Sequence, residues 1–306
     1  MGKIVSEKSL TNLKLKIADI IIEVLSDNWG AGFGIDVSHQ PFLVSNGKPM
    51  MTLNLHHGDI PRYEVLEEDK IFESGGAWSL YKKNGKYILP LQSPSLGKNP
   101  YKLAILDSNF KNGDIYVREN SMRLVYPLEY PLDEVLMVNL LSRGRGMEIH
   151  ACGIIDPQGL AIAFLGTSGA GKSTLANLWK TQKDITILSD DRLIIRRTRE
   201  GFQVYGTPWH GDAGACSPKS APLEKIYFLQ QASVNYIRGI TKVDCASRLL
   251  VRCFPTFYDS EGMEYTLRFC TQLSEEIPSY ELGFVPNESV LKLVRNGREV
   301  NIDDRC

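Results

Sequence analysis

A glycine-rich run that ends in a lysine is the part of the chain whose residue types and spacing most clearly suggest chemistry. Residues 166–174 read GTSGAGKST and fit the pattern G-x4-G-K-[ST]. Glycines allow backbone N–H groups to turn toward phosphate oxygens, and Lys172 can bridge the β- and γ-phosphates as a catalytic group. The pattern predicts a binding loop for ATP and Mg²⁺, with Ser173 as a metal ligand. Its members are Gly166, Thr167, Ser168, Gly169, Ala170, Gly171, Lys172, Ser173 and Thr174.

Two adjacent aspartates follow a short apolar segment downstream of this loop. Ile185–Ser189 has the composition of a strand, and Asp190 and Asp191 come directly after it. A carboxylate at the end of such a strand is the arrangement that holds Mg²⁺ in phosphate-loop enzymes. Because side chains alternate along an extended chain, one carboxylate could hold the metal and the other could meet an acceptor hydroxyl. The alternative is a pair of solvated turn or helix-capping residues.

Two histidines are further candidates for catalytic residues. His150 lies in the segment Met147–Ile155, which reads as a strand leading toward the glycine-rich loop. His210 lies in the sequence GTPWHGD, residues 206–212, whose composition is typical of a loop and suits a substrate contact. For each histidine, a hydrogen-bonded structural role is the alternative.

Arginines could stabilise the charge that develops on a transferred phosphoryl group. Arg248 and Arg252 are four residues apart on the predicted helix Asp244–Cys253 and therefore share one face. Arg192, Arg196 and Arg197 follow the two aspartates. A solvated or salt-bridged surface arginine is the alternative for each of them.

Alternating strands and helices surround these residues and predict an α/β domain over residues 131–306. The segment Gly159–Leu165 is apolar at nearly every position, which is typical of a strand covered on both faces. A helix is expected from Gly171 to about Lys180. The remaining expected elements are a helix from Asp133 to Gly144, a hairpin over Leu193–Thr198 and Gly201–Tyr205, a strand at Lys225–Leu229 and a helix at Glu288–Val294.

Residues 1–130 are predicted to form a separate, β-rich domain. Leu13–Leu25 is a dense run of apolar and β-branched residues, and Asn-Gly pairs occur at 46–47, 84–85 and 112–113. Asn-Gly favours tight hairpin turns, so these pairs predict an antiparallel meander. This domain could recognise the acceptor or a partner protein; a domain that only shields the other half is the alternative.

Composition and charge give no support to several classes of function. Lys and Arg number 35 against 36 Asp and Glu, a formal net charge of −1 at pH 7, which favours neither nucleic-acid binding nor membrane attachment. The six cysteines are scattered without a CxxC pair, which argues against a zinc site and favours a reducing cytoplasm.

Taken in order, the strand with His150, the loop GTSGAGKST and the strand ending in Asp190 and Asp191 resemble the HPr serine kinase/phosphorylase family and its HPr-kinase-related relatives. The resemblance covers roughly residues 145–232. It implies a nucleotide core like that of phosphoenolpyruvate carboxykinase, ATP as the donor and a serine-type hydroxyl as the acceptor. It also implies Asp190 as the base, Asp191 as the metal-side acid and His150 beside the transferred phosphate. Many members are oligomers, so a homo-oligomer is a possible assembly.

Two features separate the chain from that family. The sequence YGTPWHGDAG stands where the family has an arginine-glycine signature loop, and residues 1–130 do not look like the family's N-terminal domain. The acceptor is therefore left open as a protein, a peptide or an amino acid. A nucleotide-binding switch or scaffold without kinase activity is the main alternative, although a switch needs only one metal carboxylate. A carboxykinase-like decarboxylase is a third possibility, for which the chain is short.

Overall fold

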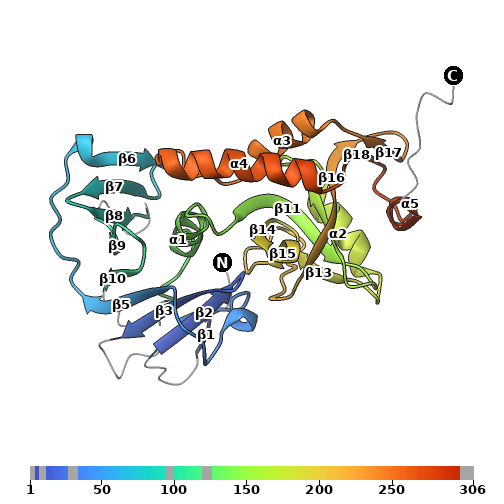
Figure 1. The fold of residues 1–306 in the computed structure, drawn as a ribbon. Coiled ribbons are helices and arrows are strands. Elements are labelled where there is room, and N and C mark those ends of the chain that lie inside the picture. The colour runs from blue at the N-terminus through green and yellow to red at the C-terminus, as the bar shows by residue number, and fades with distance from the viewer. Residues whose placement is uncertain (1–3, 7–11, 27–33, 94–98, 119–125, 297–306) are drawn as a thin grey trace. The chain divides into compact units, whose positions relative to one another are not determined.

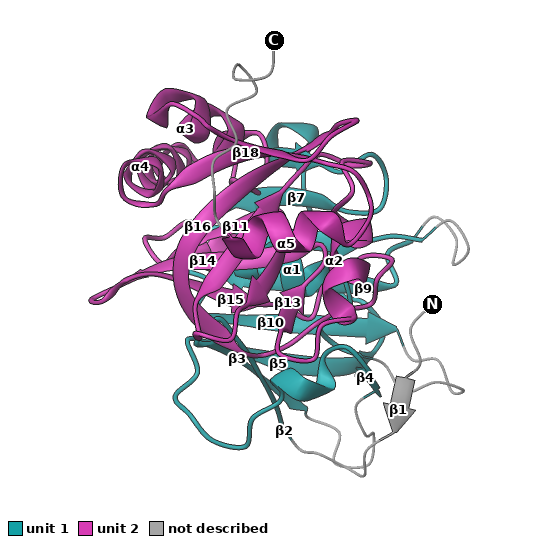
Figure 2. Cartoon of the chain, turned by 90° about the vertical axis from the view of Figure 1, so that its right-hand side faces the viewer, with its two compact units in different colours: residues 1–137 teal, residues 138–306 magenta. Residues whose placement is uncertain are grey.

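The computed structural model describes residues 4–6, 12–26, 34–93, 99–118 and 126–296. The described chain is mixed α/β, with two large mixed sheets and five α-helices (Figure 1). It divides into two compact units, residues 1–137 and 138–306 (Figure 2). Helix α1, Leu132–Leu141, spans the division. The boundary expected from the sequence, between residues 130 and 131, lies close to this point.

The first unit is built on an eight-stranded sheet. Its strand order is β2-β3-β5-β10-β9-β8-β7-β6. In chain order the strands are β2 Asn12–Ile17, β3 Ile20–Ser26, β5 Met51–Gly58, β6 Lys70–Glu73, β7 Ser79–Lys83, β8 Lys86–Leu91, β9 Lys102–Asp107 and β10 Asn112–Arg118. A two-stranded sheet pairs β1, Ile4–Ser6, with β4, Gly34–Asp36, and short 3₁₀ turns occur at η1, Gln40–Phe42, and η2, Glu67–Asp69.

The prediction of an antiparallel meander is right for part of this sheet and wrong for the rest. Strands β6 to β10 do form consecutive antiparallel pairs. However, β5 pairs in parallel with both β3 and β10, so the centre of the sheet is mixed. Parallel neighbours require connections longer than a hairpin, and such pairings leave no local signature in the sequence.

Of the three Asn-Gly pairs, only Asn84-Gly85 forms the expected hairpin turn, between β7 and β8, with φ of 51° and 72°. Asn46-Gly47 lies in the connection before β5, and Asn112-Gly113 begins β10. The β9–β10 turn is made instead by residues 108–111, where the Asp107 carboxylate accepts backbone N–H groups of the turn.

The dense run Leu13–Leu25 is two strands rather than one. A tight turn at Ala18 and Asp19, with φ of 49° and 59°, folds β3 back on β2. Neither residue is a glycine or an asparagine, which explains why the turn was not predicted.

The second unit has a strand order of β12-β11-β14-β15-β16-β18-β17, with β13 added beside β11. An additional parallel pairing of β12 with β16 closes a circuit of five strands. The strands are β11 Met147–Ile155, β12 Ala161–Leu165, β13 Thr186–Ser189, β14 Arg192–Thr198, β15 Gly201–Gly206, β16 Ser220–Gln231, β17 Tyr236–Gly239 and β18 Ser279–Phe284. The helices that follow α1 are α2 Lys172–Lys180, α3 Lys242–Leu250, α4 Ser260–Glu276 and α5 Ser289–Asn296.

Helices cover both faces of this sheet, as the all-apolar strand β12 predicted. Ala161, Ala163 and Leu165 pack in a cluster with α3 and α4. Ile162 and Phe164 point the other way and pack with α2 and α5. All five residues of β12 are buried. Figures 1 and 2 show the two helix pairs on opposite sides of the sheet.

The elements expected around the glycine-rich loop are confirmed, including the strand before it, the helix after it and the β14–β15 hairpin. Helix α4, the longest in the described chain, was not predicted, and neither were β17 and β18. No helix of the described residues has the length and apolar character needed to cross a membrane. The five cysteines within the described chain are all free thiols.

Candidate nucleotide and acceptor site

The glycine-rich loop connects the end of β12 to the start of α2. Gly169 and Gly171 have φ of 78° and 102°, a region that side chains with a Cβ rarely adopt. A Cβ on Gly171 would also lie 2.5 Å from Phe284 Cζ. Helix α2 begins at Lys172 without a side-chain cap, so its first N–H groups are left to bind another acceptor.

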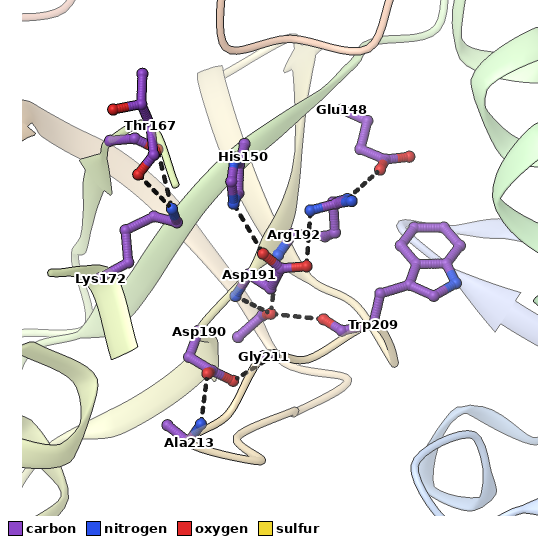
Figure 3. Close-up of polar contacts among 12 residues, drawn as sticks. Glu148, His150, Thr167, Lys172, Asp190, Asp191, Arg192, Trp209, Gly211 and Ala213 are labelled. Carbon is purple, nitrogen blue, oxygen red and sulfur yellow. Dashed lines mark hydrogen bonds and ion pairs between the residues drawn. The ribbon is translucent and has the colours of Figure 1, made fainter. Parts of the chain in front are cut away.

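Lys172 folds back over the start of this loop. Its Nζ donates hydrogen bonds to the carbonyl oxygens of Gly166, at 2.9 Å, and Thr167, at 3.2 Å (Figure 3). The residue is only 6% exposed. Burial lowers the pKa of Lys172, and the neighbouring Asp191 carboxylate acts in the opposite direction. The ammonium group is therefore held within the loop by two backbone carbonyl groups rather than by a direct ion pair.

A cavity of about 400 Å³ opens beside the loop. It brings together residues that are distant in the sequence: the loop, the strand with His150, the second aspartate and the segment after β15. The lining residues are His150, Ser168, Gly169, Gly171, Lys172, Ser173, Thr174, Asp191, Gly211 and Asp212. Its volume suits a small-molecule ligand.

Asp191 faces this cavity and is held from two sides. Its Oδ1 lies 2.9 Å from Nε2 of His150, and its Oδ2 accepts a hydrogen bond of 2.7 Å from Nη1 of Arg192 (Figure 3). Burial raises the pKa of the Asp191 carboxyl, but the His150 hydrogen bond and the charges of Arg192 and Lys172 outweigh it, so the pKa is lowered. Arg192 is itself fixed by Glu148, at 3.4 Å, and its guanidinium lies 4.3 Å from the centre of the Phe254 ring.

Asp190 points away from Asp191 and is 1% exposed. Its Oδ1 accepts the backbone N–H of Gly211 at 3.1 Å, and its Oδ2 accepts that of Ala213 at 2.9 Å (Figure 3). Oδ1 also accepts the backbone N–H of Ala215 at 3.1 Å. The carboxylate thereby anchors residues 211–215, and this segment brings Gly211 and Asp212 to the cavity. Asp190 does not line the cavity.

Ser189 is a residue of the site that sequence reasoning missed. Its hydroxyl donates to the carbonyl oxygen of Trp209 at 2.8 Å and accepts the N–H groups of Asp191 and Arg192. It thus joins the turn after β13 to the segment after β15. The only feature of the sequence that could have indicated this role is the position of Ser189 directly before the two aspartates. Gly211 and Asp212 belong to the segment 206–212 that was predicted to contact a substrate, although His210 was the residue chosen from it.

His210 is not among the residues that line the cavity in the described chain. The residue is exposed, and its Nδ1 lies 3.0 Å from the carbonyl oxygen of Gly211. The structure thus brings Lys172, Ser173, Asp191 and His150 together, and it leaves the catalytic role predicted for His210 without geometric support.

Asp190→Asn is expected to destabilise the protein more than a neighbouring change. An amide has one acceptor oxygen and turns an N–H₂ group toward backbone donors, so at least one buried N–H loses its partner, which costs about 1–3 kcal/mol. Thermal unfolding measures this, with Asp212→Asn, an exposed aspartate of the same segment, as the matched control. Equal midpoints for the two variants would contradict the anchoring role.

No family model matches the chain, and no curated protein matches its sequence. What the chain does is therefore inferred from the geometry of the site.

Proposed function

We propose that the chain is an ATP- and Mg²⁺-dependent kinase that transfers the γ-phosphoryl group to a serine-type hydroxyl of a protein, a peptide or an amino acid. One observation carries the proposal: a single cavity is lined by the phosphate-binding loop, by Lys172 and by the Asp191–His150 pair. The first two are suited to a triphosphate and the third to an acceptor hydroxyl. A nucleotide core of the HPr kinase type, at work in the cytoplasm, belongs to the same proposal.

The donor atoms of the site fit a triphosphate. The first N–H groups of α2 and the ammonium of Lys172 are the groups that bind phosphate oxygens in such loops. Lys172 is already held beside Gly166 and Thr167, so little side-chain entropy remains to be lost when a phosphate is bound.

Two oxygens of the kind that bind Mg²⁺ lie close to Gly211. A Cβ on Gly211 would lie 2.8 Å from Asp190 Oδ2 and 3.4 Å from Ser173 Oγ, so this carboxylate oxygen and this hydroxyl oxygen are near each other. Oδ2 of Asp190 accepts one backbone N–H and retains lone-pair capacity for a metal. Mg²⁺ is typically bound by one or two protein oxygens together with substrate phosphates. When bound, it would neutralise charge on the phosphates.

This geometry favours an exchange of the roles that the family resemblance implied. Asp191 lines the cavity and would accept the proton of the acceptor hydroxyl. Asp190 would anchor residues 211–215 and border the metal site with Ser173. His150 would keep the Asp191 carboxylate oriented through its hydrogen bond to Oδ1, and Arg192 would do so through Oδ2.

Transfer of label from γ-labelled ATP tests the proposal. Purified protein with Mg²⁺ is incubated with free serine, with serine peptides and with a cytoplasmic extract. We expect label in one acceptor class. Nucleotide binding without label in any acceptor would favour the switch or scaffold alternative, and the absence of nucleotide binding would overturn both.

A further inference from the structure

We propose that Arg252 is the arginine that contacts the γ-phosphoryl group during transfer. The inference rests on the proposed function and selects one residue among several arginines of the second unit. It depends on three observations: where Arg252 lies, what its guanidinium binds, and what its neighbours already neutralise.

Arg252 does not itself line the cavity, but its backbone contacts His150 and its side chain lies near the strand that pairs with β12, the strand before the loop. Its carbonyl oxygen accepts the backbone N–H of His150 at 2.7 Å. Its guanidinium lies 5.5 Å from the centre of the Phe228 ring. Phe228 pairs in the sheet with Leu165, the residue directly before Gly166. The backbone of Arg252 is thus bonded to His150, which lines the cavity, and its side chain lies over a residue that pairs with the end of β12.

The guanidinium of Arg252 has no carboxylate partner within the described residues. Its Nη1 donates to the carbonyl oxygen of Arg248 at 2.9 Å, and its Nε is buried without a hydrogen-bond partner in the described chain. A guanidinium has five N–H donors, and an unmade bond at a buried donor costs about 1–3 kcal/mol. A bound anion would therefore supply hydrogen bonds and an opposite charge that this guanidinium lacks.

The neighbouring arginines are already engaged. Arg192 is bound to Asp191 and Glu148, so its charge orients the proposed base. Arg248 and Arg238 both bind Glu281, at 2.9 Å and 2.5 Å. Redirecting Arg192 would break its ion pairs with Asp191 and Glu148, and redirecting Arg248 or Arg238 would break one of the two ion pairs of Glu281, whereas redirecting Arg252 breaks one bond to a backbone carbonyl.

The charge of Arg252 also acts on the pKa of Lys172. The pKa of Lys172 is lowered mainly by burial and also by the charges of Arg192 and Arg252. The pKa of Arg252 is itself lowered by burial and by Arg248. Like charges repel each other, and an anion bound near Lys172 would reduce this repulsion.

The transfer step explains why this charge matters. The acceptor oxygen forms a bond to the γ-phosphorus, the bond from the γ-phosphorus to the bridging oxygen breaks, and that electron pair stays on ADP. The acceptor's proton passes to Asp191. Negative charge is spread over the three γ-oxygens in the transition state, and an arginine placed there stabilises it.

Binding of ADP with aluminium fluoride, a mimic of the transferring phosphoryl group, tests the inference without an identified acceptor. In the wild type with Mg²⁺, we expect aluminium fluoride to tighten ADP binding by about 10²-fold. Arg252→Met keeps an apolar stem over Phe228 and is expected to lose most of that gain, while its affinity for ADP alone stays within about three-fold, because the arginine acts on the transition state. Arg252→Lys should recover part of the gain.

Arg238→Met is the matched control, since Arg238 is largely exposed and Glu281 retains its ion pair with Arg248 in this variant. It is expected to behave as the wild type. Retention of the full aluminium fluoride gain by Arg252→Met, or the absence of any gain in a wild type that binds ADP, would overturn the inference and leave the proposed function standing. Failure of the wild type to bind ADP or ATP would instead remove the proposed function, and the inference with it.

Discussion

Lys172→Ala is expected to reduce phosphoryl transfer by at least about 10²–10³-fold. The ammonium group lies in the cavity wall, held by the carbonyl oxygens of Gly166 and Thr167, where it can bridge the β- and γ-phosphates. The methyl group of alanine cannot replace this charge. Turnover of γ-labelled ATP, together with calorimetric titration of nucleotide, measures the loss. Lys183→Ala, an exposed lysine just beyond α2, is the matched control and should act as the wild type.

The same substitution is not expected to unfold the protein. Burial lowers the pKa of Lys172, which means that the folded state disfavours its charged form. A group of this kind does not supply stability at neutral pH, so the thermal midpoint of Lys172→Ala should equal or exceed that of the wild type. Loss of transfer with an intact fold would therefore be a loss of chemistry. Turnover at the wild-type rate in this variant would refute the phosphate-loop assignment.

The strand, glycine-rich loop and helix at residues 161–180 could be predicted from the sequence because their geometry is local. Gly169 and Gly171 adopt positive φ values, and the strand and helix on either side follow from short-range patterns. The same reasoning failed for Asn46-Gly47 and Asn112-Gly113, because a turn-prone pair does not decide which strands it connects. The parallel pairing of β5 with β3 and β10 joins segments distant in the chain.

Helix α4 shows a signal that was present but was not used. Thr266, Phe269, Cys270 and Leu273 are buried and recur at helical spacing, while charged residues occupy other positions. Its start at Ser260 carries no side-chain cap from Asp259, so the terminal signal is weak. The periodicity, rather than the cap, was the evidence available in the sequence.

The roles of the two aspartates could not be separated in the sequence. Alternation along an extended chain predicts that Asp190 and Asp191 point in different directions, and they do. Which of them faces the cavity depends on the backbone N–H groups of Gly211, Ala213 and Ala215, more than twenty residues away. Those donors surround Asp190 and leave Asp191 to His150 and Arg192.

Asp191→Asn is expected to lower the rate of transfer by about 10²–10⁴-fold while nucleotide affinity stays within a few-fold. An amide fills the same space but cannot take the proton of the acceptor hydroxyl. Single-turnover transfer and nucleotide titration, measured side by side, separate the two effects. Asp184→Asn, a partly exposed aspartate paired with Arg295, is the control and should leave both quantities unchanged.

The pH dependence of the wild type gives a second test of Asp191. Since the pKa of this carboxyl is lowered, it remains deprotonated, and able to act as a base, until the pH falls through that lowered value. The acidic limb of the rate profile that belongs to Asp191 should therefore lie below about 3.9, the usual pKa of aspartate. His150→Ala removes a hydrogen bond that lowers this pKa, and should move that limb toward higher pH.

The comparison with Asp190→Asn decides between the two assignments. If Asp191 is the base, Asp191→Asn loses transfer at temperatures where the variant is folded. Its thermal midpoint also falls, because the lowered pKa of Asp191 means that the folded state favours the charged carboxylate. Asp190→Asn then loses stability, and transfer falls in part, as residues 211–215 lose their anchor and the proposed metal site loses a carboxylate oxygen. The reverse result, with transfer lost in a fully stable Asp190→Asn variant and retained in Asp191→Asn, would restore the order that the family resemblance implied. The two carboxylates would then differ in reactivity for a reason other than their access to the cavity.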